Sequence, residues 1–306
     1  MKDKLELLDP KLLSTSEFKE FRYWKKVVAA EVGWHYPLDI TWILYNLKRH
    51  KLPKGSVILD AGGGYGLMQF ILAGEGYKII SVDLTSRKKL LPLKMLFKIN
   101  IFENKMTKYK YMSHINSVFK NRNLLQKALI LSKRLKYFSP LLFIHEVINR
   151  KQHGEINFYQ GDFSNLSLLK NNSVDAIVSC SSIEHCTTYK TIQKSFAEFT
   201  RIIKPNSPII ITTSATNKKT WFHKPSQGWC FSKEDLIKLF KLKKPISNYK
   251  YYKLIFTRIF HSEQLKNNLP SYYFTTGNSG MPWGKWNPKY LPVGVLTTYR
   301  NSHKTS

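Results

Sequence analysis

Two acidic residues and the glycine cluster between them are the residues of this sequence best suited to holding a ligand. Asp60 ends one short apolar run, Asp83 ends the next, and residues 61–66 between them contain four glycines. Glycines let a backbone turn sharply and approach a ligand closely. Asp83 follows Gly62 by 83 − 62 = 21 residues, and a carboxylate about 20 residues after such a loop is placed to bind the hydroxyls of a ribose. This order predicts a nucleotide pocket.

The apolar runs supply the elements that position this pocket. Val57, Ile58 and Leu59 form an unbroken aliphatic run, which predicts a strand buried on both faces, with Asp60 where its carboxyl end meets solvent. Ligands of open α/β sheets bind at that edge. Residues 67–73 then predict a helix, so the segment is a strand, a loop, a helix and a second strand in order.

The glycine spacing separates this loop from that of dinucleotide enzymes. Those enzymes show G-x-G-x-x-G, whereas Gly62, Gly64 and Gly66 give G-x-G-x-G. In this respect the sequence resembles the class I S-adenosylmethionine-dependent methyltransferases, whose first motif is an acid followed by G-x-G-x-G and whose second is an acid that closes the next strand. Tyr65 differs from the small residue that the family often has at its position.

Three later segments follow the family's order, so the resemblance covers residues 56–213 apart from an insertion. They are residues 156–163, 173–186 and 196–213. The resemblance implies an α/β fold with a seven-stranded, mostly parallel sheet in a Rossmann-like three-layer sandwich. It also implies S-adenosylmethionine as cofactor and S-adenosylhomocysteine as product. The implied cofactor-binding residues are Asp60, Gly62, Gly63, Gly64, Gly66, Asp83, Leu84, Asp162, Phe163, Cys180 and Ser181.

The acidic residues have a second interpretation, because single carboxylates at strand ends and turns are common on protein surfaces. In the family, the residues at the positions of Asp162 and Phe163 accept the adenine amine and cover the adenine ring. Since Asp60, Asp83 and Asp162 follow three successive apolar runs, we interpret them together as ligand contacts.

The segment around Cys180 to Cys186 resembles small-molecule and glycan methyltransferases that have a Glu-His pair at this position. His185 has a pKa suited to taking a proton from a hydroxyl group near neutral pH, and Glu184 is placed in sequence to orient it. The alternative is that the pair is structural, with Glu184 capping the following helix. His223, after the fifth predicted strand, is a second candidate base.

Aromatic residues cluster near both ends of the sequence. Trp34, His35 and Tyr36 precede the first core strand, and Trp283 and Trp286 lie near the end. Together with Trp221 they are candidates for a lid over the cofactor or for a platform on which a sugar or planar acceptor stacks. The alternative is ordinary packing. We predict acceptor contacts at Trp34, Tyr36 and Trp221.

The net charge of +29 is unevenly distributed. Residues 87–151 contain sixteen Lys and Arg against two acids, so 16 − 2 = +14 comes from this segment. It separates the second predicted strand from the third by more than a crossover helix needs, and we predict a helical insertion. Ser139 and Pro140 look like the N-cap and first residue of one helix. Residues 124–138 predict a basic amphipathic helix, which covers the core, lies on a membrane or binds an anionic ligand.

The charge also raises the possibility of nucleic acid as a partner. The segment after the fourth predicted strand lacks the Asn/Asp-Pro-Pro-aromatic tetrad of base-amine methylases, and neither Cys180 nor Cys186 follows a proline. RNA methylation through phosphate binding by the basic insertion is therefore the alternative function. A non-catalytic S-adenosylmethionine-binding module is the second alternative.

The sequence has no apolar run of about 18 residues, the length a membrane span needs, and its first residues lack the apolar stretch of a signal peptide. We expect a cytoplasmic protein, and peripheral attachment to the inner membrane surface through the basic insertion is one of the alternatives for that segment. Cys180, Cys186 and Cys230 are too few and too widely spaced for a disulfide scaffold or a zinc site, so we predict no metal.

These observations divide the chain into four parts. We expect an N-terminal helical cap over residues 1–50, a methyltransferase core over 51–86 and 154–240, the basic helical insertion over 87–153, and aromatic-rich strands with an acceptor-side extension over 241–306. Ser232 is predicted to cap a helix of the core. The expected reaction transfers a methyl group to a small-molecule hydroxyl, with a sugar or lipid-linked glycan of surface-polysaccharide synthesis favoured.

Overall fold

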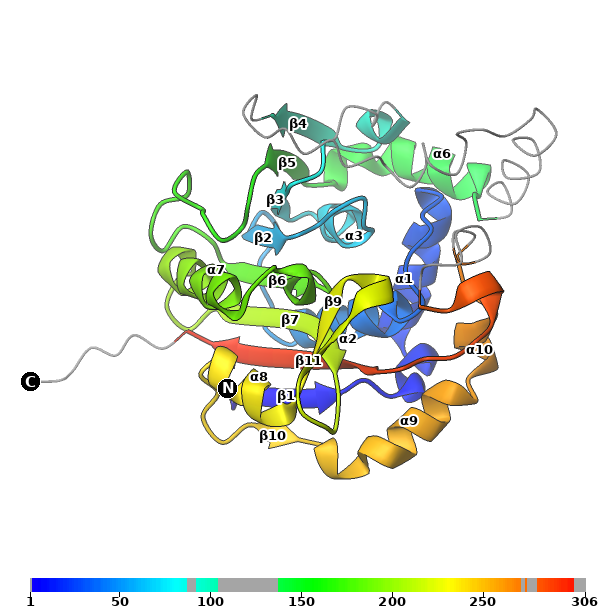
Figure 1. Ribbon diagram of the computed structural model, residues 1–306. Coiled ribbons are helices and arrows are strands. Elements are labelled where there is room, and N and C mark those ends of the chain that lie inside the picture. Colours follow the sequence, from blue (N-terminus) through cyan, green and yellow to red (C-terminus); the bar gives the residue numbers. More distant parts are fainter. Residues whose placement is uncertain (1, 87–91, 104–136, 271–272, 274–279, 300–306) are drawn as a thin grey trace, which may run out of the picture.

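A single mixed sheet runs through the protein, with helices on both faces (Figure 1). The computed structural model describes residues 2–86, 92–103, 137–270, 273 and 280–299. The strand order is β10-β1-β11-β7-β6-β2-β3-β5-β4, and a β8–β9 hairpin pairs with β7. The strands are β1 (Lys4–Leu7), β2 (Val57–Ala61), β3 (Lys78–Asp83), β4 (Lys98–Phe102), β5 (Glu155–Gln160), β6 (Ala176–Cys180), β7 (Pro208–Ala215), β8 (Trp221–His223), β9 (Gly228–Phe231), β10 (Ile246–Ser247) and β11 (Leu291–Thr298).

The α/β architecture agrees with the sequence-based expectation, but the sheet is larger than expected. Within the described residues it has 11 strands instead of seven. From β4 to β7 the neighbours are parallel, whereas β11 is antiparallel to both β7 and β1. Residues 1–50 are therefore more than a helical cap, because they contribute β1. The segment 87–153 is likewise more than helical, because β4 extends the sheet beyond β5.

Helices cover both faces of the sheet. In Figure 1, α1, α2, α3 and α6 lie on one side and α7 and α8 on the other. The α-helices are α1 (Ser16–Val27), α2 (Tyr36–Lys48), α3 (Met68–Gly74), α6 (Pro140–Asn149), α7 (Tyr189–Ile202), α8 (Lys233–Leu239), α9 (Tyr252–Phe260) and α10 (Glu263–Lys266). The 3₁₀ helices are η1 (Pro10–Ser14), η2 (Pro92–Met95), η3 (Arg150–Gln152), η4 (Ile183–His185), η5 (Lys224–Ser226), η6 (Tyr249–Tyr251) and η8 (Pro282–Gly284).

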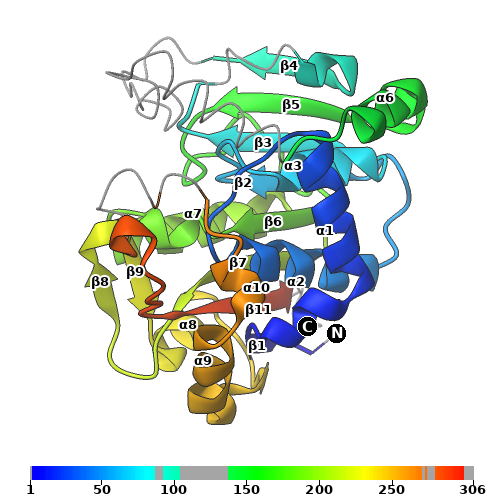
Figure 2. The same ribbon diagram turned by 90° about the vertical axis from the view of Figure 1, so that its right-hand side faces the viewer.

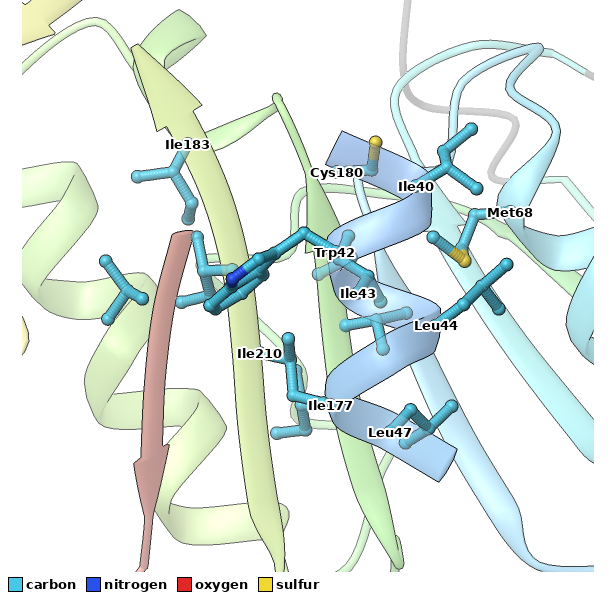
Figure 3. Packing of buried hydrophobic residues seen from close by; sticks show 14 of the residues in the cluster. Ile40, Trp42, Ile43, Leu44, Leu47, Met68, Ile177, Cys180, Ile183 and Ile210 are labelled. Atoms are coloured by element: carbon cyan, nitrogen blue, oxygen red, sulfur yellow. The ribbon is translucent and has the colours of Figure 1, made fainter. Parts of the chain in front are cut away.

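Helix α2 is the element that connects the core to the site. Buried residues lie on nearly every face of α2, and Ile40, Ile43 and Leu44 are among those that pack in the core beside the sheet (Figure 3). Trp42 lies against β11, where a Cβ at Gly294 would come within 2.6 Å of its ring. This close packing fixes the position of the helix, and with it the residues at its first turn.

Two helix starts agree with the sequence predictions. The Ser139 Oγ accepts from the Leu142 N–H at 3.4 Å at the start of α6, and the Ser232 Oγ accepts from the Asp235 N–H at 3.1 Å at the start of α8. The basic amphipathic helix predicted over 124–138 lies almost entirely outside the described residues and stays a prediction. None of the described helices combines the length and apolarity that crossing a bilayer requires.

Candidate active site

The glycine loop follows β2 and is shaped by close contacts with the rest of the protein. Gly62 and Gly64 have φ angles of +76° and +45°, which L side chains rarely adopt. A Cβ at Gly62 would lie 2.4 Å from the Ser182 Cβ, and a Cβ at Gly63 would lie 2.2 Å from the Asp60 Oδ2. The loop therefore needs glycine for its conformation and for its packing.

Asp83 lies at the end of β3, directly beside the loop. Its Oδ2 accepts from the Gly64 N–H at 2.9 Å, and its Oδ1 accepts from the Thr85 N–H at 2.7 Å. Since an ionised carboxylate has about four acceptor positions, these two bonds orient it and leave capacity for two hydroxyl groups. The neighbouring Leu84 is exposed.

Asp60 occupies a different position from the one expected. The sequence predicted a carboxylate at the solvent edge, whereas the Asp60 side chain is fully buried within β2. Its Oδ2 accepts from the Ser81 Oγ at 3.3 Å, beneath Gly63. Because β2 is central in the sheet, its last residues are covered by the loop that follows, and Asp60 supports that loop from below.

Asp162 and Phe163 form the turn after β5. The Asp162 Oδ1 accepts from the Ser164 N–H at 2.7 Å, which closes the turn and leaves the aspartate exposed. The Phe163 ring lies 3.2 Å from the position of a Cβ at Gly62. The β5 turn and the glycine loop therefore meet, as the order of the segments predicted.

Two consecutive serines after β6 connect this loop to α2. The Ser181 Oγ donates to the Asp39 Oδ2 at 2.9 Å, and the Ser182 Oγ donates to the Gly62 carbonyl at 2.7 Å. Ser181 has a φ of +47°, a strained conformation for a residue other than glycine. The preceding Cys180 is buried, which raises the pKa of its thiol.

His35 and Asp39 form a buried pair at the first turn of α2. The His35 Nδ1 lies 2.6 Å from the Asp39 Oδ2, and both side chains are almost fully buried. Burial by itself would lower the pKa of His35, but the charge and hydrogen bond of Asp39 outweigh it and raise that pKa. We call His35, Tyr36, Asp39, Ser181 and Glu184 the acceptor-side cluster.

Glu184 belongs to this cluster because of its burial and its electrostatic neighbours. Its carboxylate accepts from the Thr213 Oγ1 at 3.0 Å and the Ser214 Oγ at 3.4 Å. Burial raises the pKa of Glu184, although the imidazoles of His185 and His35 act in the opposite direction. The charges of Glu184 and Asp39 also raise the pKa of Tyr36, after the larger effect of burial. These groups therefore share one low-dielectric region.

Among the described residues, no hydrogen bond joins His185 to Glu184. Its side chain is exposed, and its Nδ1 lies 2.9 Å from the Gln227 carbonyl, to which it donates. The Gln227 carbonyl, and not Glu184, orients the ring. Glu184 does not cap the next helix either, because the Thr188 Oγ1 accepts from the Thr191 N–H at the start of α7.

The remaining predicted residues meet around Tyr290. Its ring centre lies 5.6 Å from that of His223 and 5.9 Å from that of His35. Burial and the charge of Lys289 lower the pKa of His223, and its Nδ1 lies 2.7 Å from the Ser226 Oγ. The half-buried Trp221 lies edge-on to His223.

Trp34 is buried, with its ring centre 4.9 Å from His35 and 5.5 Å from Trp286. The aromatic groups from the two ends of the sequence therefore pack together. In this arrangement Trp34 supports His35 and offers no open stacking surface.

The sequence interpretation missed the His35–Asp39 pair. A histidine and an aspartate at i and i+4 on one predicted helix face each other, so the spacing offered a signal. The spacing gave no signal for the third member, because Ser181 joins the pair from the end of β6, 142 residues after Asp39 in the chain.

The geometry fits S-adenosylmethionine. The glycine loop, the Asp83 carboxylate and the Asp162–Phe163 turn come from three neighbouring strands and meet at one edge of the sheet. The Asp83 carboxylate has acceptor capacity for the ribose hydroxyls, the exposed Asp162 for the adenine amine, and Phe163 presents a ring at the same place.

Comparison with known proteins finds a methyltransferase domain over part of the chain. The model of a methyltransferase domain matches residues 142–211, which include the Asp162–Phe163 turn, β6 and the loop with Glu184. Comparison with curated proteins finds no match.

Similar solved structures include the cyclase SpnF, with 12% identity, a TM-score of 0.49 and coverage of 88% of this chain and 83% of the other. A putative sarcosine dimethylglycine methyltransferase from Galdieria sulphuraria has 15% identity and a TM-score of 0.43, and the match covers 92% of this chain and 98% of that one. The 1,6-didemethyltoxoflavin-N1-methyltransferase of Burkholderia thailandensis, solved with S-adenosylhomocysteine, has 14% identity and a TM-score of 0.39, and the match covers 65% of this chain and 64% of that one.

The matched domain model, the G-x-G-x-G loop and the strand-end acids agree with one another. With S-adenosylmethionine as its cofactor, the chain carries a class I S-adenosylmethionine-dependent methyltransferase domain.

Proposed function

We propose that the protein methylates a hydroxyl group of a small molecule, with a sugar or a lipid-linked glycan of surface-polysaccharide synthesis as the favoured acceptor. The observation that carries the hydroxyl assignment is the buried His35–Asp39 pair beside the loop after β6. An imidazole is suited to accept a hydroxyl proton near neutral pH. The choice of a sugar rests on the sequence resemblance and on the aromatic rings around the cluster.

In this proposal His35 is the base. In the neutral ring the Nδ1–H donates to Asp39, so Nε2 carries the lone pair. Within the part of the chain that the structure describes, Nε2 has no hydrogen-bond partner. Asp39 fixes this tautomer and stabilises the charged ring that proton uptake creates.

His185 is the second candidate base. Because its Nδ1 donates to the Gln227 carbonyl, its Nε2 is also an acceptor. Because methyl transfer to oxygen depends on positioning and on exclusion of water, the exposure of His185 makes it a weaker candidate for the base than His35. Glu184, whose pKa is raised, is proposed to hydrogen-bond the acceptor or to balance the charge of His35. His223 is assigned to packing beside Tyr290.

The proposal needs little further chemistry from the protein. When bound, S-adenosylmethionine supplies an electrophilic methyl group on a positively charged sulfur. His35 takes the hydroxyl proton at Nε2, Asp39 holds the resulting imidazolium, and the surrounding aromatic rings keep water away from the acceptor.

The experiment is a transfer assay with S-adenosylmethionine labelled on its methyl group. Nucleotide sugars, sugar phosphates and lipid-linked glycans are offered in parallel with total RNA. We expect label on a carbohydrate hydroxyl. His35→Gln should then lower the rate at least about 100-fold and change S-adenosylhomocysteine affinity less than about twofold, while His185→Gln should have the smaller effect on rate.

The other outcomes decide between the alternatives. Label on RNA alone, with strong salt dependence, would replace the proposal with RNA methylation, an alternative that the charge of +29 favours. Cofactor binding without product on any acceptor would favour a non-catalytic binding module.

A further inference from the structure

Helix α6 carries apolar side chains on two opposite sides. Leu142, Phe143 and Val147 pack against the core, whereas Leu141, Ile144 and Ile148 face solvent with 80%, 55% and 74% of their surface exposed. We call these three residues the α6 ridge. Positions i, i+3 and i+7 form one stripe along a helix. Single exposed aliphatic residues are ordinary, but a contiguous exposed stripe marks an interaction surface.

A group of cationic residues lies just beyond the C-terminal end of α6. A surface hollow of about 260 Å³ lies at the C-terminal end of α6, between η2, β4 and η3. Its rim includes Lys94, Arg150 and Lys151, which we call the basic collar. These side chains have no ion pair within the described part of the chain, whereas the adjacent Lys98 binds Glu155 at 3.1 Å.

The ridge and the collar lie at one end of the molecule. In both Figure 1 and Figure 2, α6 and β4 lie at the top, at the edge of the sheet farthest from β10. The exposed side chain of Met95 adds apolar surface to the lining of the hollow. The segment 104–136, which in sequence contains basic residues and no acidic one, joins the described structure between β4 and α6.

We propose that this end of the protein docks on an anionic lipid bilayer, with the α6 ridge in the headgroup boundary and the basic collar on the lipid phosphates. A helix that lies at an interface combines an apolar stripe with cationic flanks, and anionic lipids attract each such cation. The transfer of Leu and Ile side chains out of water lowers the free energy of the bound state, and so does the attraction of Lys and Arg to the negative lipid surface. The arrangement therefore matches both parts of the bilayer surface.

Two other occupants fit less well. A nucleic acid binds through its phosphates and through stacking on aromatic rings, and neither interaction uses an aliphatic ridge. A second copy of the chain would need about 800 Å² of surface from each partner, far more than three side chains provide. The docking surface is also independent of the acceptor, so it stands or falls separately from the proposed function.

The test measures binding of the full-length protein to vesicles by flotation. We expect binding to vesicles of phosphatidylglycerol and phosphatidylcholine in equal parts, and at least about tenfold weaker binding to phosphatidylcholine alone. The triple variant Leu141→Gln, Ile144→Gln, Ile148→Gln should lose at least about tenfold in affinity for the anionic vesicles.

Matched controls separate the docking surface from general stickiness and charge. Leu168→Gln, Ile246→Gln and Leu254→Gln change three aliphatic residues with 80%, 51% and 48% exposure elsewhere, and this variant should bind as the parent does. Neutralising the collar with Lys94→Gln, Arg150→Gln and Lys151→Gln should weaken binding more than neutralising the exposed residues Lys218, Lys219 and Lys253 in the same way.

All variants should bind S-adenosylhomocysteine like the parent, which shows that they are folded. The proposal is overturned if the parent does not bind anionic vesicles or if the ridge variant binds them as well as the parent. It is overturned equally if the ridge variant and its aliphatic control variant lose the same affinity. It is also overturned if the ridge variant loses dimer formation or RNA binding in place of vesicle binding, because the surface would then serve a second copy of the chain or a nucleic acid.

Discussion

The cofactor side and the acceptor side of the site are built in different ways. The cofactor side uses short stretches of consecutive residues, 60–66, 83–85 and 162–164. Backbone amides of these stretches donate hydrogen bonds to the carboxylates of Asp83 and Asp162. The acceptor side draws its side chains from positions as distant as His35, Ser181 and Tyr290, which meet only in the folded chain. A site made of local loops is readable in sequence, whereas one made of distant side chains depends on packing.

The largest expected effect tests the close packing of the cofactor side. Gly62→Ala places a Cβ 2.4 Å from Ser182 at a φ of +76°, so we expect it to destabilise the protein by about 2–5 kcal/mol. Gly55→Ala is the matched control, because Gly55 has a φ of +83° and nothing within 4 Å. It should cost only about 1–2 kcal/mol. Urea unfolding measures both, and equal losses would show that the contact with Ser182 is unimportant.

The next effect tests whether the cofactor side depends on a carboxylate. Asp83→Ala removes the acceptor of the Gly64 and Thr85 amides and of the ribose hydroxyls. Since a hydrogen bond to a charged group contributes about 1.5–3 kcal/mol, S-adenosylhomocysteine should bind at least about tenfold more weakly by calorimetry. Glu263→Ala, at an exposed site far along the chain, serves as the control. Unchanged affinity in Asp83→Ala would remove the basis for the cofactor assignment.

The acceptor side should respond to a change of a different kind. Asp39→Asn removes the charge that raises the pKa of His35, so that pKa should fall. The change should also cost about 1–3 kcal/mol of stability, because buried hydrogen bonds to a charged group are lost. NMR titration of the His35 ring reads the pKa, and calorimetry should show nearly unchanged cofactor affinity. A large loss of cofactor affinity would mean that the two sides are not separable.

The same pair predicts a pH dependence. A raised pKa means that the folded protein holds the His35 proton more tightly than the unfolded chain does. The resulting stability is fully present below the unfolded value of about 6.5 and is lost as the pH rises through the folded pKa. The stability difference between the parent and Asp39→Asn should therefore be larger at pH 5.5 than at pH 8.5. A constant difference in urea unfolding at the two values would contradict the assignment.

The smallest expected effect concerns the contact that joins the two sides. Ser182→Ala removes the bond from its Oγ to the Gly62 carbonyl and should cost about 0.5–1.5 kcal/mol. Thr200→Ala removes a hydroxyl bond to a backbone carbonyl on the exposed part of α7 and is the control. A larger effect on cofactor affinity than on stability would show that the loop after β6 positions the glycine loop.

The sequence predicted the local elements around the glycine loop for physical reasons. Glycine spacing, strand-end acids and helix caps act through neighbouring residues, so the loop after β2, the Asp83 position and the caps at Ser139 and Ser232 agree with the structure. The burial of Asp60 was missed, because covering of a strand end depends on the loop above it. The strand count was wrong because β1, β4 and β10 are short elements whose pairing depends on distant partners.

The place of β1 has a consequence for how the chain is made. Lys4–Leu7 is synthesised long before its partner β11, which spans Leu291–Thr298. During synthesis β1 stays without this partner until β11 has been made, and an unpaired strand edge is a site for aggregation in the meantime. Folding of this edge of the sheet is therefore a late, slow event with high contact order. The yield of folded protein should therefore increase at low expression temperature and with chaperones that bind nascent chains.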